Sequence, residues 1–303
     1  MAALRILFLA DSHLGCELPD RPRISRRRRG HDFLDNYHLA LAPAYAGEVD
    51  LVVHGGDVFD RPRVSAAIAY QALEPLRRIA ERGIPVVIVP GNHERSRLPH
   101  ARFAQHANIH VFDRPRSVGL EVAGMRVALS GFPYQRHNVR SEFTALLEQT
   151  EWARTAADVR LLCVHHCIEG ATVGPQNFMF RGASDVIRIN DVPAAFAGVL
   201  SGHIHRHQVL THDLRGRKVA VPVCYPGSIE RTAFAEVGEE KGFMILRVNA
   251  DNAVSPRIDW CFHRLPTRPF PERRFTPTRP SRRTHRSDPA KESMMIDLFE
   301  SRV

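Results

Sequence analysis

The chain has 303 residues, 44% hydrophobic and 25% charged, a composition typical of a globular protein large enough to bury a substantial core. Its formal net charge of +9 favours a polyanionic partner, with nucleic acid as the first candidate and an anionic membrane surface as the second. No run approaches the ~18 apolar residues of a membrane span. The five cysteines are scattered without a Cys-x-x-Cys pair, so we expect a soluble, cytoplasmic protein with reduced thiols and no membrane partner.

A short apolar run beginning at Leu51 stops at Gly55 and Gly56, and Asp57 follows immediately. The length and β-branched composition of the run are typical of a buried parallel strand. The two glycines let the backbone turn sharply and approach whatever the carboxylate holds. We therefore expect Asp57 at the carboxyl edge of a sheet, where open α/β folds place ligand sites. Taken alone, a turn with a capping aspartate explains this stretch about equally well.

The same pattern recurs on both sides of this stretch. The first predicted strand ends in Asp11-Ser12-His13, and side chains two residues apart in an extended chain point the same way. Another strand ends in Pro90-Gly91-Asn92-His93-Glu94. Apolar residues at helical spacing connect these strands, and the β-α-β-α-β order predicts a parallel sheet. The predicted elements are strands at 4–10, 51–54 and 85–89 and helices at 32–46 and 65–82.

The second half of the chain contains shorter predicted strands, two of which end in histidines, at His165-His166 and at His203 and His205. Ala123-Gly124 is typical of a tight hairpin turn. Cys163 and Cys167 flank the first histidine pair; a zinc site is one interpretation, and two small residues beside a strand end is the favoured one. The predicted elements are strands at 109–112, 117–122, 125–130, 159–164, 197–200, 218–223, 242–248 and 257–263, and a helix at 141–156.

The predicted strand ends collect two carboxylates, one amide and several imidazoles. One ion could hardly use them all, but two adjacent divalent ions could, with a bridging carboxylate such as Asp57 offsetting the repulsion between metals ~3.5–4 Å apart. Mixed nitrogen and oxygen ligands suit Mn²⁺, Fe²⁺ or Zn²⁺ and argue against Mg²⁺ or Ca²⁺. The residues are Asp11, His13, Asp57, Asn92, His93, His165, His203 and His205.

These residues, in the blocks Asp11-Ser-His13, Gly56-Asp57, Gly91-Asn92-His93-Glu94, His165 and Gly202-His203-Ile-His205, resemble the five signature blocks of the calcineurin-like metallophosphoesterases. The resemblance implies an α/β fold, a two-sheet β-sandwich flanked by helices in four layers. It also implies two metal ions, with Mn²⁺ the first choice, and a hydrolase in which His93 acts on the departing oxygen without binding metal. It assigns Asp11, His13, Asp57 and His205 to one ion, and Asp57, Asn92, His165 and His203 to the other.

Within that superfamily, the chain resembles the SbcD-like branch of DNA repair exonucleases. The resemblance is carried by Asp11-Ser-His-Leu-Gly15, Gly56-Asp-Val-Phe59, and Tyr225-Pro-Gly-Ser-Ile-Glu-Arg231 followed by Glu240-Lys-Gly-Phe243. It implies a DNA exonuclease or endonuclease, with an SbcC-like coiled-coil ATPase partner and a homodimer as further options. A small-molecule phosphodiesterase or phosphatase would use the same metal site, and a non-catalytic DNA-binding protein is the least favoured alternative. The departures are Glu94 for the family's usual aspartate, Asp60 where some relatives have histidine, and little chain after residue 250.

Two basic stretches are candidates for contact with DNA phosphates. The block 26–29 is four consecutive arginines, for which a solvated loop and a phosphate contact are equally good explanations. Residues 262–286 hold eight arginines, one acid and five prolines, typical of a linker or extended arm, and 293–301 resemble a short amphipathic segment. We expect a catalytic domain over 1–250 and a basic arm over 251–303. The candidate contacts are Arg26, Arg27, Arg28, Arg29, Arg231, Arg282 and Arg283.

Overall fold

The computed structural model describes residues 3–19, 23–249 and 257–270. The chain divides into two units, Met1–Phe270 and Pro271–Val303, and the second lies entirely outside the described residues. The predictions for Arg282, Arg283 and the terminal segment 293–301 therefore fall outside the part of the chain that the structure describes.

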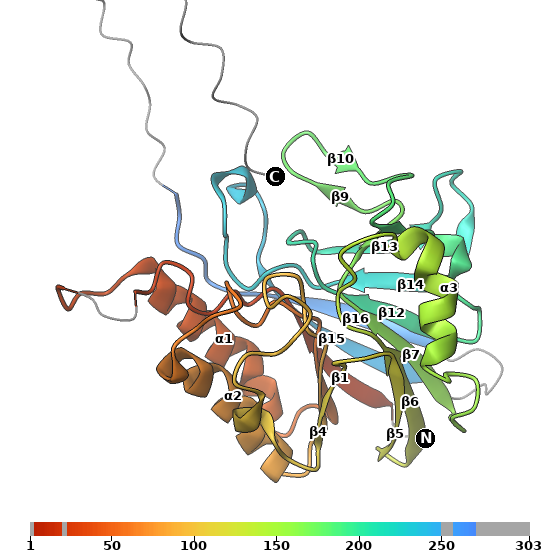
Figure 1. The fold of residues 1–303 in the computed structure, drawn as a ribbon, viewed down its shortest axis with the longest axis horizontal. Coiled ribbons are helices and arrows are strands. Elements are labelled where there is room, and N and C mark those ends of the chain that lie inside the picture. The colour runs from red at the N-terminus through yellow and green to blue at the C-terminus, as the bar shows by residue number, and fades with distance from the viewer. Residues whose placement is uncertain (1–2, 20–22, 250–256, 271–303) are drawn as a thin grey trace, which may run out of the picture. The chain divides into compact units, whose positions relative to one another are not determined.

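The first of two large sheets contains six strands: β1 (Leu4–Leu9), β2 (Leu51–His54), β3 (Val86–Ile88), β4 (Ile109–Val111), β15 (Gly242–Asn249) and β16 (Arg257–Arg264). Their order is β16-β15-β1-β2-β3-β4 (Figure 1). Strands β1 to β4 are mutually parallel, whereas β15 runs antiparallel to both β1 and β16. Helices α1 (Arg29–Tyr45) and α2 (Ala66–Glu81) pack against one face of this sheet. This arrangement confirms the predicted β-α-β-α-β unit.

The second large sheet also contains six strands: β5 (Arg116–Val122), β6 (Met125–Gly131), β7 (Val159–Val164), β12 (Gly198–Ser201), β13 (Gln208–His212) and β14 (Lys218–Tyr225). Their order is β13-β14-β12-β7-β6-β5, with β6, β7, β12 and β14 parallel at its centre. Helix α3 (Val139–Gln149) packs on its outer face (Figure 1). The remaining short elements are β8 (Cys167–Ile168), β9 (Thr172–Val173), β10 (Phe178–Met179), β11 (Val186–Ile187), η1 (Ala101–Ala104), η2 (Ile189–Asp191) and η3 (Phe234–Glu236).

The two sheets pack face to face, and strand β1 shows why its sequence is apolar apart from Arg5. Leu7 and Leu9 contact the helices α1 and α2, whereas Phe8 on the opposite face belongs to the cluster between the sheets. Because both faces of the strand are covered, its side chains need not alternate between apolar and polar. Two six-stranded sheets flanked by helices confirm the predicted α/β sandwich.

Two predicted boundaries differ from the structure. The helix expected over 141–156 ends at Gln149, where the Thr150 hydroxyl donates to the carbonyl of Leu147 and Glu151 has a φ of 54°. Such a side-chain bond to the preceding turn competes with continuation of a helix. Strand β16 carries the packed unit beyond residue 250 because it pairs with β15 along its whole length, and Ile258 is buried between the sheets. Residues 262–264, expected at the start of the arm, belong to this strand.

No helix among the described residues is both long and apolar enough to cross a lipid bilayer.

We expect the cluster between the sheets to dominate stability. Replacing Leu161, which is fully buried in β7, by alanine should lower the free energy of unfolding by about 2–5 kcal/mol, because it removes apolar contacts and leaves a cavity. Urea denaturation followed by circular dichroism measures the change. The control is Leu214→Ala, since Leu214 is 40% exposed. Equal losses for the two variants would contradict this account of the core.

Candidate metal centre

Strands from both sheets end at one place, and each delivers polar side chains there. Asp11 and Asp57 follow β1 and β2 of the first sheet, whereas His165 and His203 follow β7 and β12 of the second. Backbone groups join the two sheets at this point. His165 Nδ1 lies 2.7 Å from the carbonyl oxygen of Gly55, and the backbone N–H of His203 donates to the Asp11 carboxylate at 3.0 Å.

Several of these residues have left-handed backbone conformations that are uncommon outside glycine. The φ angles are 51° at Asp11, 43° at His13, 51° at Asp57 and 81° at His203. Such conformations are costly and persist where surrounding hydrogen bonds hold them, as they do at many functional sites. Here the backbone N–H of Asp11 donates to Gly56 O at 2.9 Å, and that of His13 donates to Asp57 O at 3.0 Å. The first two strand ends therefore hold each other in these conformations.

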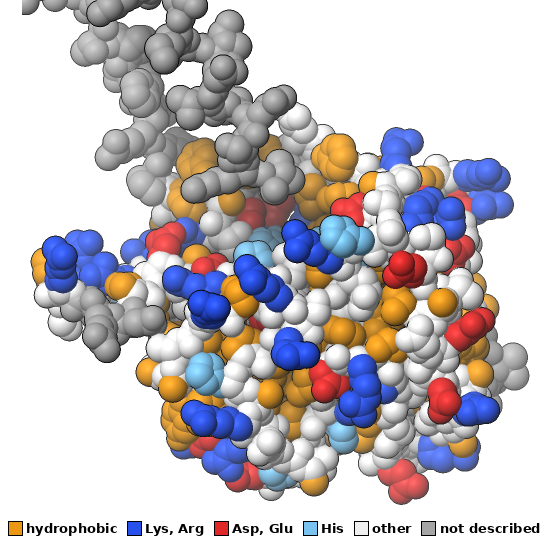
Figure 2. All heavy atoms as spheres, viewed as in Figure 1, with side chains coloured by type: hydrophobic (Ala, Val, Ile, Leu, Met, Phe, Trp, Pro, Cys, Tyr) orange, Lys and Arg blue, Asp and Glu red, His pale blue; other side chains and the backbone are white. Residues whose placement is uncertain are grey.

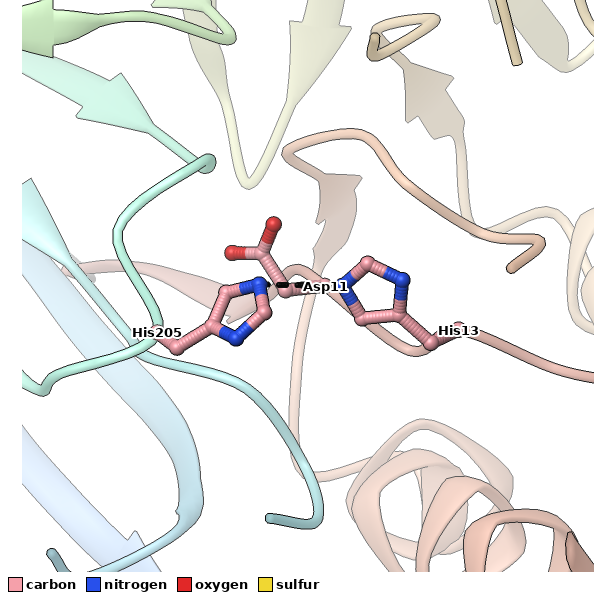
Figure 3. Close-up of side chains that lie close together, drawn as sticks. All are labelled: Asp11, His13 and His205. Carbon is pink, nitrogen blue, oxygen red and sulfur yellow. Dashed lines mark hydrogen bonds between the residues drawn. The ribbon is translucent and has the colours of Figure 1, made fainter. Parts of the chain in front are cut away.

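All eight residues predicted for the site converge. His13 Nε2 lies 3.0 Å from His205 Nε2, beside Asp11 (Figure 3). The Asn92 side-chain oxygen lies 3.0 Å from His165 Nε2 and 2.9 Å from His203 Nδ1. Three groups have ligand atoms within 4.8 Å of one another: Asp11, His13 and His205; Asp11, Asp57 and His165; and His13, Asp57 and His93.

Charge and burial oppose each other strongly in the centre. Burial favours a neutral Asp57, yet the charge and hydrogen bond of His165, whose Nε2 is 3.2 Å from Asp57 Oδ2, keep the pKa of Asp57 well below its usual range. Burial also disfavours a charged His165, but the two carboxylates raise its pKa to about 9. Burial lowers the pKa of His203 to about 3 and that of His13 well below its usual value. Since metal ligation requires neutral imidazoles, a cation bound here would displace the proton of His165.

The donor set fits a divalent cation centre. The facing Nε2 atoms of His13 and His205 would repel each other through their lone pairs unless a proton or a cation lay between them. The neighbouring donors are buried carboxylate oxygens and the Asn92 oxygen, which attract a cation as well. This mixture of imidazole and oxygen donors is typical of Mn²⁺, Fe²⁺ and Zn²⁺ sites.

His93 occupies the rim of the centre and is half-buried. Its backbone N–H donates to Asp57 Oδ1 at 2.9 Å, and its Nδ1 lies 2.7 Å from the carbonyl oxygen of Asp60. A carbonyl can only accept, so Nδ1 carries the proton and Nε2 is the atom available to the site. The His93 ring is 4.5 Å from that of His13.

The Glu94 side chain connects the loop after β2 to the loop after β3, both of which carry candidate ligands. Its carboxylate accepts from the backbone N–H groups of Phe59 at 3.0 Å and Gly91 at 2.8 Å. Burial, reinforced by the charge of Asp57, raises the pKa of Glu94 to about 8. Glutamate at this position thus supports the strand ends after β2 and β3, which is how the chain accommodates its departure from the family's aspartate.

The second histidine of the pair after β7 lies away from the candidate ligands. His166 Nε2 accepts from the backbone N–H of Gln135 at 3.0 Å, and the His166 ring stacks on Tyr134. Cys163 and Cys167 are buried thiols, and neither belongs to a candidate metal group within the described ranges. His165 is therefore the histidine of this pair that faces the centre, and a zinc site at these cysteines has no support from the geometry.

Several arginines predicted to contact DNA pair with groups of the protein itself. Arg27 pairs with Asp32 and Asp35, at 2.6 and 2.7 Å. Arg29 contacts Glu17 and the Arg231 carbonyl oxygen, and its guanidinium lies over the Phe270 ring. The Arg231 guanidinium donates to three backbone carbonyls, and Arg28 Nη2 lies 3.4 Å from another. Arg26 is exposed. Lys and Arg side chains are distributed over the face in Figure 2 with Asp and Glu among them.

Sequence reasoning missed the side chains that support His205. Glu236 and Thr232 both lie within 3.0 Å of His205 Nδ1, and Lys241 is completely buried beside Glu236. All three lie between β14 and β15, but only Lys241 belongs to a block of the branch-specific resemblance. The one signal in the sequence is Lys241 within the block Glu240-Lys-Gly-Phe243, whereas Thr232 and Glu236 lie outside the quoted blocks.

Comparisons with known proteins agree with this geometry. The family model for calcineurin-like phosphoesterase matches residues 4–207. The SbcD component of the SbcCD nuclease of Bacillus subtilis is 28% identical over 270 residues, which cover 80% of this chain and 66% of that protein. DNA double-strand break repair protein Mre11 of Methanopyrus kandleri is 25% identical over 251 residues, 79% of this chain and 51% of that protein. The chain thus spans between half and two thirds of the length of these two relatives.

A shorter match and a structural one complete the comparisons. The Mre11 protein of Haloferax volcanii is 37% identical over 93 residues, 31% of this chain and 20% of that protein. The crystal structure of TT1561 of Thermus thermophilus superposes with a TM-score of 0.49 at 10% identity, over 86% of this chain and 99% of that one. Because the family match covers more than half of the sequence and contains every strand end that converges on the centre, the chain belongs to the calcineurin-like phosphoesterase family, a family of metal-dependent hydrolases.

Proposed function

We propose that the protein is a phosphodiester hydrolase dependent on two metal ions, which acts on DNA as an exonuclease or endonuclease in DNA repair. The observation that carries this proposal is the convergence of eight candidate site residues from five strand ends. The DNA substrate is supported by the nuclease and repair relatives and by the formal net charge of +9. On the same grounds we propose a coiled-coil ATPase of the SbcC kind as a partner, and a homodimer.

We assign Asp11, His13, Asp57 and His205 to one ion, with support from the 3.0 Å approach of the two imidazoles beside Asp11. We assign Asp57, Asn92, His165 and His203 to the second ion. The assignment is supported by the two imidazoles of this set, which both lie within 3.0 Å of the Asn92 side-chain oxygen. Asp57 lies between the two sets, since its carboxylate belongs to a candidate group with His13 and to another with His165. We propose Mn²⁺ as the native metal, with Fe²⁺ or Zn²⁺ as alternatives of the same donor preference.

The chemistry follows from this arrangement. Two divalent ions held by these residues would acidify water and neutralise charge on the phosphoryl oxygens. Asp57 stays ionised and holds both sets of ligands in register, because its oxygens contact His165 and the backbone N–H of His93. The Asp60 carbonyl orients the His93 ring so that Nε2 faces the site. When Nε2 also carries a proton, the imidazolium can donate that proton to the departing oxygen. Hydrolysis then requires no covalent enzyme intermediate.

A direct assay tests the substrate. The purified protein with Mn²⁺ is incubated with linear, circular and single-stranded DNA, and separately with bis-p-nitrophenyl phosphate. We expect cleavage of DNA as well as of the chromogenic diester. Cleavage of the small diester alone would overturn the DNA proposal and leave a phosphodiesterase for small molecules.

Asp57→Asn tests the bridging role. Loss of the shared negative charge should lower both the turnover and the number of ions bound, because repulsion between the cations is then uncompensated. Elemental analysis of the folded variant gives the metal content, with the exposed Asp113→Asn as the control. Two tightly bound ions in an inactive Asp57→Asn protein would contradict the assignment.

His93→Ala distinguishes an acid–base group from a ligand. We expect both ions to remain bound while turnover falls roughly 10²–10⁴-fold, the usual range for a positioned acid–base group. The matched control is His137→Ala, an exposed histidine. Because the structure also places His93 within reach of His13 and Asp57 ligand atoms, loss of one ion from His93→Ala would show that it is a ligand.

Truncation after Phe270 tests the basic arm without cutting the packed unit, since β16 ends at Arg264 and Leu265 is buried. Residues 271–286 contain six arginines and one acid. Each phosphate they neutralise contributes about −0.9 to the slope of log affinity against log salt. We expect weaker duplex binding and a flatter slope, with hydrolysis of the chromogenic diester unchanged. Unchanged affinity and slope would show that the arm does not bind DNA.

A further inference from the structure

The imidazole of His205 is held from behind by a buried ionic cluster. His205 Nδ1 lies 2.9 Å from Glu236 Oε1 and 3.0 Å from the Thr232 hydroxyl oxygen. The Thr232 hydroxyl itself donates to Glu236 Oε1 at 2.7 Å, and the Thr232 backbone N–H donates to Glu236 Oε2 at 3.0 Å. The Glu236 carboxylate thus accepts from the Thr232 hydroxyl and from the Thr232 N–H. Because an ionised carboxylate can only accept, its contact with His205 Nδ1 requires Nδ1 to be a donor as well.

Lys241 keeps this carboxylate in place. Its side chain is completely buried, and its ammonium contacts Glu236 at 2.9 Å and Glu239 at 3.0 Å. The same ammonium donates to the backbone carbonyl of His205 at 2.8 Å. The Lys241 ammonium therefore connects the Glu236 carboxylate, which contacts the His205 ring, to the backbone of His205 itself. The ring and its partner are thus fixed relative to one another.

We infer that Glu236 is a positioning residue for the metal centre: it fixes the His205 tautomer with the proton on Nδ1 and presents Nε2 to the metal. An ionised carboxylate can only accept, so a hydrogen bond to Nδ1 excludes the alternative tautomer. Nε2, the opposite nitrogen, then carries a lone pair and faces His13 and Asp11 (Figure 3). This inference rests on the proposed role of His205 as a metal ligand.

The competing explanation is that Glu236 only closes its own loop. Glu239 provides the matched control, because it lies in the same loop, contacts the same Lys241 ammonium and is similarly buried, but pairs with Arg206 instead of the His205 ring. A role confined to loop structure predicts similar effects for the two glutamates. A role in orienting His205 predicts an effect on metal binding from Glu236 alone.

The experiment measures the affinity of the protein for each of its two ions, by chelator competition against Mn²⁺. We expect Glu236→Ala to weaken one ion roughly 10–100-fold and to leave the other unchanged, the usual cost of losing a partner that orients a ligand. Glu236→Gln keeps an acceptor oxygen for Nδ1–H and should recover much of that affinity. Glu239→Ala, the matched substitution, should bind both ions as the unaltered protein does.

The tautomer of His205 can also be measured in the unaltered protein, where the result does not depend on whether a variant folds. In the Zn²⁺-loaded protein, ¹⁵N NMR of the imidazoles should show His205 protonated at Nδ1, with the proton strongly hydrogen-bonded. Protonation at Nε2 would overturn the inference, and so would a folded Glu236→Ala protein that binds both ions with unaltered affinity. Equal metal loss in Glu239→Ala would assign the effect to the loop. If His205→Ala binds both ions normally, the ligand assignment itself fails, which separates the two proposals.

Discussion

The close approach of the two sheets at their carboxyl ends is the constraint on which the centre depends. His165 comes from the second sheet, yet its Nδ1 lies against the carbonyl of Gly55 in the first. A Cβ on Gly56 would overlap that ring, and one on Gly202 would overlap the carbonyl oxygen of Gly55. Side chains at these two glycines would force the sheets apart. The candidate metal donors can therefore meet only because the backbones of the two sheets touch.

This junction concentrates groups that would destabilise an ordinary core. Asp11, Asp57 and His165 are fully or almost fully buried, and four of the candidate residues have left-handed backbone conformations. Each such conformation costs about 1–3 kcal/mol and must be compensated by the surrounding structure. The apolar clusters on both faces of β1 and between the sheets provide that surrounding structure. Left-handed non-glycine residues occur at other turns of the described chain as well, but here four of them gather at one site.

The sequence allowed much of the fold and the candidate site to be predicted, because the site residues follow short apolar strands directly. Asp57 after Gly55-Gly56 is a local pattern, and parallel strands bring such ends together. The support of His205 by Glu236 could not be anticipated, since 31 residues separate them and no periodicity relates a loop glutamate to a strand end. Nor does charge alone reveal that Arg29 and Arg231 contact backbone carbonyls within the protein. Pairing across the chain decides such roles.

The stretch between β14 and β15 explains how one candidate ligand, His205, is held in position relative to the others. His205 follows β12 of the second sheet. Lys241 contacts both the His205 backbone carbonyl and Glu236, and it immediately precedes β15 of the first sheet. The same stretch contacts the first sheet again where Ser228 pairs with Ala10, the residue before Asp11. The support of His205 is therefore anchored beside the strand that delivers Asp11. A movement of one sheet relative to the other would break these contacts. The stretch therefore restrains the position of His205 relative to Asp11, in addition to the packing of the two sheets.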